Sequence, residues 1–127
     1  MQTNLAPITI GSIEATNQLK QVIMNLMKNA MEAIDDQHER EIYLSASVQN
    51  EFATIVIKDN GCGMSEEARA LLYIPFFSTK EKGTGLGLSV CKEIIDRLGG
   101  SIHVDSSQGK GTIFTISFPP TLIVNKL

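Results

Sequence analysis

A loop with alternate glycines is the first part of this sequence whose residue types could do chemistry. The stretch "TKEKGTGLGLSV", residues 79–90, places Gly83, Gly85 and Gly87 directly before an apolar segment with a helical pattern. Glycine-rich turns that enter a helix present backbone N–H groups to phosphate oxygens, and the helix N-terminus adds positive potential. The spacing matches neither G-x-x-x-x-G-K-[ST] nor G-x-G-x-x-G, so the loop by itself is compatible with a phosphate site or with a flexible linker.

Two asparagines, Asn25 and Asn29, stand four residues apart in the stretch "NLMKNAMEA". On a helix this spacing places both amides on one face, one turn from each other. Asparagine is a poor residue for a helix interior, so two on one face need a reason. One explanation is hydrogen bonding between helices. The other is ligation of Mg²⁺, a cation that takes oxygen ligands from proteins, water and substrate phosphates.

A third feature is the stretch "KDNGCGM", residues 58–64, which follows a predicted strand. Asp59 at the end of that strand can accept a hydrogen bond from an exocyclic amine such as that of adenine. Gly61 and Gly63 allow a ligand to approach the backbone closely. A tight Asx turn without any ligand would give the same letters, and both explanations remain open.

Between these features and the glycine loop lies "PFFSTK", residues 75–80. Two neighbouring rings, Phe76 and Phe77, either anchor a mobile lid onto the core or pack as part of the core. Lys80 supplies positive charge beside the glycine loop in a chain that is otherwise acidic. This lysine is therefore a candidate contact for a phosphate group.

The chain of 127 residues carries a formal net charge of −3 and 43% hydrophobic residues. Those values describe one ordinary globular domain and argue against a nucleic-acid partner. Cys62 and Cys91 lack metal-ligand spacing and are expected to be free thiols of a reducing compartment. We find no apolar run of membrane-spanning length and no signal-peptide pattern, and so expect a cytoplasmic domain without membrane contact.

Hydrophobic spacing predicts helices and strands that alternate along the chain. Helices are expected over 17–34, in a short segment capped by Ser65, and over 86–98 before Gly99-Gly100. Strands are expected over 42–48, 52–58, 101–106 and 112–118, with a short edge strand over 8–10. This order predicts an α+β fold, a two-layer sandwich with a mixed, mostly antiparallel sheet and its helices on one face.

The asparagine pair, D-x-G-x-G, the phenylalanine pair, G-x-G-x-G and a late G-T, in this order, resemble the ATP-binding domain of sensor histidine kinases. That domain belongs to a wider family shared with type II topoisomerases, heat-shock-90 chaperones and mismatch-repair ATPases. The resemblance covers residues ~11–119 of a single domain, 1–127, and implies a Bergerat-type sandwich that holds ATP·Mg²⁺ under a flexible lid. The asparagine helix and the short lid are most similar to those of sporulation-type and nitrogen-regulation sensor kinases.

The resemblance also implies catalytic roles for single residues. Asn29, together with Asn25, would bind Mg²⁺ and phosphate, and Lys80 would complete the catalytic group. Many sensor kinases have a basic residue at the position of Glu32, so in this chain Lys80 or Lys82 would contact the γ-phosphate instead.

Nucleotide binding would involve a larger set of residues. The resemblance implies that the adenine amine donates to Asp59, that Thr112 reaches the base through water, and that the loop glycines close over the phosphates. The implied nucleotide contacts are Asp59, Gly61, Gly63, Met64, Phe76, Phe77, Thr79, Gly83, Thr84, Gly85, Leu86, Gly87, Leu88 and Thr112.

One position separates the members of this family by their chemistry. Hydrolytic members place a glutamate four residues before the metal-binding asparagine, where it activates water as a general base. Here that position is Asn25, whose amide cannot take a proton. The expected reaction is therefore transfer of the γ-phosphoryl group to a histidine. The alternatives are a serine kinase of the anti-sigma type and a nucleotide-sensing module without catalysis.

The acceptor histidine is expected on another polypeptide segment. In sensor kinases it lies on a helix and is followed by an acidic residue and then a proline, a pattern that neither His38 nor His103 has. Both are predicted to be surface residues. The expected partners are a histidine-bearing helical dimerisation domain of the parent kinase and a downstream response regulator. Any membrane anchor would belong to other parts of that kinase.

Overall fold

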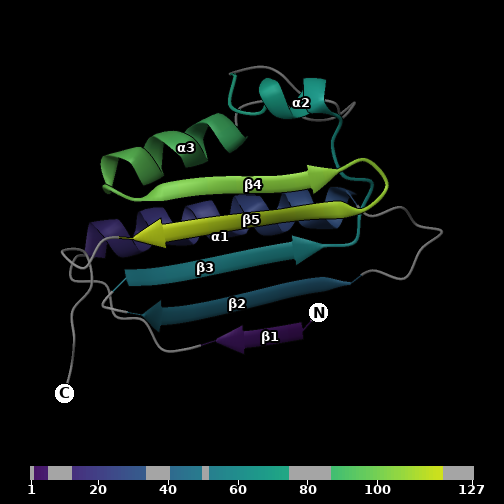
Figure 1. The fold of residues 1–127 in the computed structure, drawn as a ribbon. Coiled ribbons are helices and arrows are strands. Elements are labelled where there is room, and N and C mark those ends of the chain that lie inside the picture. Colours follow the sequence, from purple (N-terminus) through teal and green to yellow (C-terminus); the bar gives the residue numbers. More distant parts are fainter. Residues whose placement is uncertain (1, 6–12, 34–40, 50–51, 75–86, 119–127) are drawn as a thin grey trace.

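The computed structural model describes residues 2–5, 13–33, 41–49, 52–74 and 87–118. The elements are β1 (Gln2–Leu5), α1 (Ile13–Ala33), β2 (Ile42–Gln49), β3 (Phe52–Asp59), α2 (Glu66–Ala70), α3 (Gly87–Arg97), β4 (Ser101–Ser107) and β5 (Gly111–Phe118). The strands form one sheet in the order β1-β2-β3-β5-β4 (Figure 1). β1 runs parallel to β2, and all other neighbouring strands are antiparallel.

The two long helices form a second layer on one face of this sheet. In Figure 1, α1 runs behind the strands, and it packs against α3 as well as against β3 and β5. Burial on α1 follows the helical repeat, with Leu19, Val22, Leu26 and Ala30 inside. The apolar stripe of the sequence is thus the face that packs on the core, as an amphipathic helix requires.

The short helix α2 begins at the predicted capping residue. The backbone N–H of Ala68 donates to Ser65 Oγ at 3.1 Å. Glu66 and Glu67 lie in the first turn, where negative charge is favourable beside the helix N-terminus. The sequence-based prediction of this cap is confirmed.

The strand register lines up the helix-facing side chains in rows that cross the sheet. Two of these rows are apolar, namely Ala46–Ile55–Ile116–Ile102 and Leu44–Ile57–Phe114–Val104. The next row, at the carboxyl end of β3, is Ile42–Asp59–Thr112–Ser106. We call its three polar members, Asp59, Thr112 and Ser106, the polar row. The register therefore places three polar side chains at one end of an otherwise apolar face.

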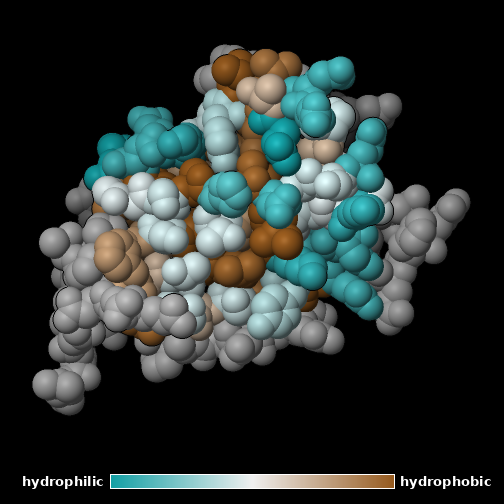
Figure 2. All heavy atoms as spheres, in the orientation of Figure 1, coloured by the Kyte–Doolittle hydropathy of each residue, from teal (hydrophilic) through white to brown (hydrophobic). Residues whose placement is uncertain are grey.

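The opposite face of the sheet has a different character. Figure 2 shows it from the viewpoint of Figure 1, with many pale side chains over the strands. Ser45, Thr54, Thr115 and Ser117 are half-buried there, and His103 is exposed on β4. The prediction that His103 is a surface residue is confirmed.

Among the described residues, no helix has both the length and the hydropathy needed to cross a membrane.

The predicted fold is confirmed, with two differences in the N-terminal part. α1 begins at Ile13, four residues before the predicted start at 17, because the apolar stripe used for the prediction begins only at Leu19. Strand β1, "QTNL", was not predicted, since it has no alternating pattern and is held by parallel pairing with β2. The strand predicted over 8–10 lies outside the described residues, as do positions 34 and 86 at the ends of the predicted helices.

Candidate functional site

The elements that carry the candidate site residues meet at one end of the molecule. In Figure 1, the carboxyl ends of β3 and β4, the amino end of β5 and the C-terminal half of α1 lie on the right, and the N-terminus of α3 is the end of that helix nearer to them. Residues far apart in the sequence are therefore neighbours in space. Asp59, Thr112, Asn29 and the start of α3 come from four different elements of this end.

Asp59 is the last residue of β3 and is only 5% exposed. Its Oδ1 accepts a hydrogen bond from the backbone N–H of Gly61 at 2.8 Å. The Asx turn considered from the sequence is therefore present. A carboxylate offers about four acceptor positions on two oxygens. The carboxylate can thus accept from the Gly61 N–H and from an amine of a ligand at the same time. The turn also fixes the direction of the carboxylate.

Gly63 and Gly111 are explained by contact between backbone segments. Gly63 has φ +68° and Gly111 has φ +90°, values that favour glycine. A Cβ at Gly63 would collide with the carbonyl oxygen of Ser107, and one at Gly111 with the carbonyl oxygen of Asp59. These glycines therefore let the segment after β3 lie directly against the β4–β5 hairpin. The bond from the Gly109 N–H to the Cys62 carbonyl oxygen, 2.7 Å, joins the same two segments.

Ser106 is a site residue that the sequence analysis missed. Ser106 is 7% exposed and Thr112 5%, and their hydroxyl oxygens lie 2.8 Å apart. Ser106 Oγ also accepts from the Met64 N–H at 2.9 Å and lies 3.0 Å from the Gly111 carbonyl oxygen. The predicted hairpin contained the signal that could have found it, because Ser106 is the cross-strand partner of Thr112.

The asparagine pair lies on α1, with both side chains half-buried. Asn25 Nδ2 donates to Cys91 Sγ of α3 at 3.7 Å, and the Cys91 thiol lies 3.9 Å from the Val22 carbonyl oxygen. Burial raises the pKa of the Cys91 thiol, and the bond from Asn25 partly opposes that shift. The explanation by hydrogen bonding between helices thus holds for Asn25. Ligation of Mg²⁺ by Asn25 and Asn29 stays a prediction.

Most of the predicted lid lies outside the described residues. This applies to Phe76, Phe77, Thr79, Lys80, Lys82, Gly83, Thr84, Gly85 and Leu86. Gly87 is the first residue of α3, and a Cβ placed there would meet open space. Leu88 is half-buried against the core. The first turn of α3, residues 87–90, carries no acidic side chain, so nothing within it offsets the positive potential of the helix N-terminus.

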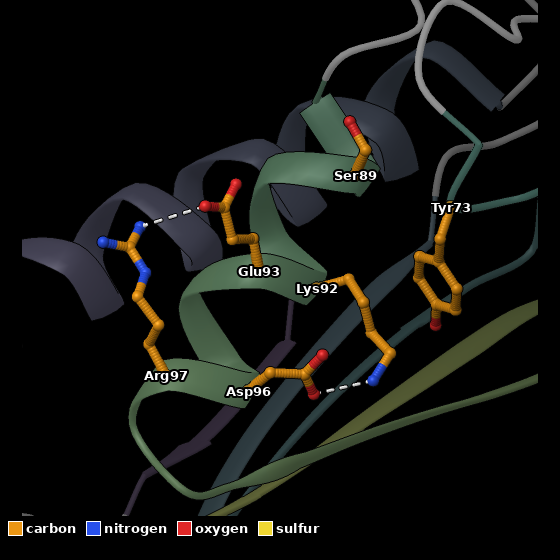
Figure 3. Close-up of a pocket in the computed structure, with 6 residues that line it drawn as sticks. All are labelled: Tyr73, Ser89, Lys92, Glu93, Asp96 and Arg97. Carbon is orange, nitrogen blue, oxygen red and sulfur yellow. Dashed lines mark hydrogen bonds and ion pairs between the residues drawn. The ribbon is translucent and has the colours of Figure 1, made fainter.

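A second group of polar residues lies along α3, away from the polar row. A shallow cavity of about 510 Å³ is lined by Tyr73, Ser89, Lys92, Glu93, Asp96 and Arg97. Figure 3 shows these six side chains. The charged groups pair along the helix, with Lys92 Nζ 2.7 Å from Asp96 Oδ1. Such exposed pairs contribute little to stability. The Tyr73 hydroxyl is buried without a hydrogen-bond partner among the described residues, and burial raises its pKa, with smaller effects of Cys91 and Asp96.

Comparison with known proteins shows to which family the chain belongs. Residues 14–122 match the family described as "Histidine kinase-, DNA gyrase B-, and HSP90-like ATPase". The chain belongs to this ATPase family. Its members are ATP-binding domains, and the matched residues include the polar row, the N-terminus of α3 and the asparagine pair of α1.

Individual members of the ATPase family agree with this assignment. The chain is 45% identical over 103 residues to sporulation kinase E of Bacillus subtilis (strain 168). These 103 residues make up 81% of this chain and 14% of that kinase. The mycobacterial sensor histidine kinase MprB has a similar structure, with a TM-score of 0.78 at 25% identity over 93% of this chain and 81% of that one. Full-length ShkA in complex with AMPPNP gives the same TM-score and identity over 98% of this chain and 26% of that one.

These comparisons confirm the predicted resemblance to histidine kinase domains and to sporulation-type kinases in particular. They also confirm the predicted sandwich fold. The chain spans only a small part of the kinases it matches, 14% in the case of sporulation kinase E. The matched part is the ATPase domain of a two-component signalling kinase.

Proposed function

We propose that this chain binds ATP·Mg²⁺ and donates the γ-phosphoryl group to a histidine on a separate helical domain of a sensor histidine kinase. The observation that carries the proposal is the buried carboxylate of Asp59, placed beside Thr112 at the end of the sheet in a member of an ATP-binding family. A carboxylate offers about four acceptor positions on its two oxygens and can accept from more than one donor. The adenine amine is such a donor.

Base recognition follows from the polar row. The Gly61 N–H donates to Asp59 Oδ1 at 2.8 Å and fixes the direction of the carboxylate, to which we assign the exocyclic amine as a further donor. Thr112 lies opposite Asp59 on the neighbouring strand and contacts the base through water. GTP has a carbonyl oxygen in place of the amine and would meet an acceptor instead of a donor. The pocket is therefore expected to prefer ATP.

Phosphate and metal binding are assigned to the helices. Amide oxygens of Asn29 and Asn25 are suitable ligands for Mg²⁺, which when bound neutralises charge on the phosphate oxygens. The N-terminus of α3, preceded by Gly83 and Gly85, presents backbone N–H groups to the phosphates. Lys80 supplies the positive charge that the transferred group needs. Together these residues position the γ-phosphate and leave the chemistry to the incoming acceptor.

Transfer is favoured over hydrolysis by the residue at position 25. An asparagine there cannot act as a general base for water, whereas a neutral imidazole attacks without such help. His103 is exposed on β4, on the sheet face away from the helices, so it is not placed to be the acceptor. We therefore assign the acceptor to a helical dimerisation domain and the next transfer to a response regulator. We propose the cytoplasm as the location of this single domain, 1–127.

Radiolabelled ATP tests this proposal in two steps. The chain alone should bind ATP·Mg²⁺ without labelling itself and without releasing phosphate appreciably. When a dimeric helical domain with an acceptor histidine is added, that domain should gain acid-labile label, slowly, because the two parts are not tethered. The Asp59→Asn chain is the matched control and should label the domain much less.

Each other outcome of this experiment identifies a different function. Acid-stable label on serine would indicate a serine kinase of the anti-sigma type. Rapid release of free phosphate by the chain alone would indicate an ATPase. Tight ATP binding with no transfer to any histidine domain of a sporulation-type kinase would indicate a nucleotide-sensing module.

A further inference from the structure

The Ser106 hydroxyl lies at the centre of three contacts that together use all of its hydrogen-bonding capacity. The Met64 N–H donates to Ser106 Oγ at 2.9 Å, the Gly111 carbonyl oxygen lies 3.0 Å away, and the Thr112 hydroxyl lies 2.8 Å away. A hydroxyl has one proton to donate and two lone pairs to accept with. Three partners therefore leave no capacity unused.

These contacts fix which atom donates in each bond. The Gly111 carbonyl oxygen can only accept, so the single Ser106 proton points to it. The Thr112 hydroxyl must then donate to Ser106. In the opposite arrangement Ser106 would donate to Thr112. Two acceptors, Ser106 Oγ and the Gly111 oxygen, would then face each other at 3.0 Å without a proton between them.

We infer that Ser106 is a positioning residue for nucleotide selectivity, because it engages the Thr112 proton and leaves only Thr112 lone pairs for the water that reaches the base. The inference rests on the proposed function. Asp59, the neighbour of Thr112 on β3, is a carboxylate and also accepts. The polar row thus presents acceptors only. It favours bases with an amine at this edge, as in 6-aminopurines, and disfavours bases with a carbonyl oxygen there.

The position of Ser106 is held by two contacts from the segment that follows β3. Arg69 of α2 donates to the Ser106 carbonyl oxygen at 3.2 Å. The Met64 N–H that donates to the hydroxyl follows directly after Gly63, whose backbone lies against Ser107. Burial of Ser106, at 7% exposure, keeps water from competing for these bonds. The hydroxyl is therefore fixed before any nucleotide binds.

Binding of ATP and of ITP, which has a carbonyl oxygen in place of the amine, tests the inference by calorimetry with Mg²⁺ present. The parent chain should prefer ATP by at least about tenfold. Ser106→Ala frees the Thr112 proton to donate to the water beside the base, and that water can then donate to the carbonyl oxygen of ITP. The preference for ATP should therefore narrow by about tenfold. Thr112→Val removes the hydroxyl oxygen that acts as the acceptor and should also narrow the preference for ATP over ITP. Adding Ser106→Ala to Thr112→Val should then change the ratio less than about twofold.

Two matched variants separate this role from a structural one. Ser107→Ala makes the same change at the exposed neighbouring position and should leave the ratio unchanged. Ser106→Thr keeps a hydroxyl on a strand that accepts β-branched residues and should keep the ATP preference, even if Ser106→Ala folds poorly.

The outcomes distinguish this inference from the proposed function. Equal losses of ATP and ITP affinity in Ser106→Ala, with the ratio kept, would show that Ser106 only supports the fold and would overturn the inference. A parent that binds both nucleotides equally would overturn it as well, while nucleotide binding itself would stand. A folded parent that binds neither nucleotide would overturn the proposed function and with it the inference.

Discussion

The polar row and the apolar row of Ile55 and Ile116 lie on the same face of one sheet and are buried to a similar degree. Ile116 is 0% exposed and Ile55 8%, against 5% for Asp59 and Thr112 and 7% for Ser106. The difference lies in what compensates for burial. Apolar side chains gain free energy when they leave water, whereas polar groups lose it unless hydrogen bonds replace the water. One row therefore stabilises the fold, and we propose that the other holds acceptors for a nucleotide.

The largest effect is expected from truncating a fully buried apolar side chain at the other end of the sheet. Phe118 is 1% exposed, and Phe118→Ala should lower the free energy of unfolding by about 3–5 kcal/mol. Urea denaturation measures this. Where the variant is still folded, its ATP to ITP ratio should equal that of the parent. Phe52→Ala, at a position 49% exposed, is the control and should be far milder. A changed ratio in Phe118→Ala would show that the two ends of the sheet are not separate.

Asp59→Asn is expected to weaken nucleotide binding with little effect on stability, the reverse of Phe118→Ala. The asparagine keeps an oxygen for the Gly61 N–H, so the melting temperature should change little. It also places an amide donor where the base needs an acceptor, and ATP binding should weaken by roughly 1.5–3 kcal/mol, about ten- to a hundredfold. Calorimetry measures the loss of affinity, and Asp105→Asn, at an exposed position of β4, is the control. Equal affinity of the parent for ATP and GTP would contradict this assignment.

A smaller effect on binding is expected from the asparagine face of α1. Asn29→Ala should remove an oxygen ligand of Mg²⁺, and the metal-dependent tightening of ATP binding, about tenfold, should be lost. The melting temperature should stay the same, since alanine is a better helix residue. Asn17→Ala, exposed on the same helix, is the control. If Asn29→Ala simply unfolds, both asparagines serve to hold α1 against its neighbours.

The smallest effect is expected at Tyr73, whose buried hydroxyl lacks the bonds that the polar row has. It has no hydrogen-bond partner among the described residues. Tyr73→Phe removes this buried polar group and should leave stability unchanged or raise it by up to about 1 kcal/mol. Tyr43→Phe on the other face of the sheet is the control, and thermal melting is the measurement. A clear loss of stability would show that the Tyr73 hydroxyl is bonded in solution.

Much of the fold could be predicted because its signals are local. The spacing of Leu19, Val22 and Leu26 indicated the buried stripe of α1, and Ser65 indicated the start of α2. Strand β1 gave no such signal, because its four residues depend on parallel pairing with β2. Local patterns report which face of an element is buried. They do not report pairing between segments about forty residues apart in the chain.

The features of the candidate site also divide into those that local sequence determines and those that only the tertiary structure shows. The sequence determined that Asp59 lies at the end of a strand, that Thr112 lies near the start of another, and that Asn25 and Asn29 share a helix face, since each depends on residues a few positions apart. Only the tertiary structure decided that Asp59, Thr112 and Ser106 form one row, that the Ser106 proton points to Gly111, and that Asn25 donates to Cys91. Register and hydrogen-bond direction arise from strands and helices that meet only after folding, so no local pattern of residues encodes them.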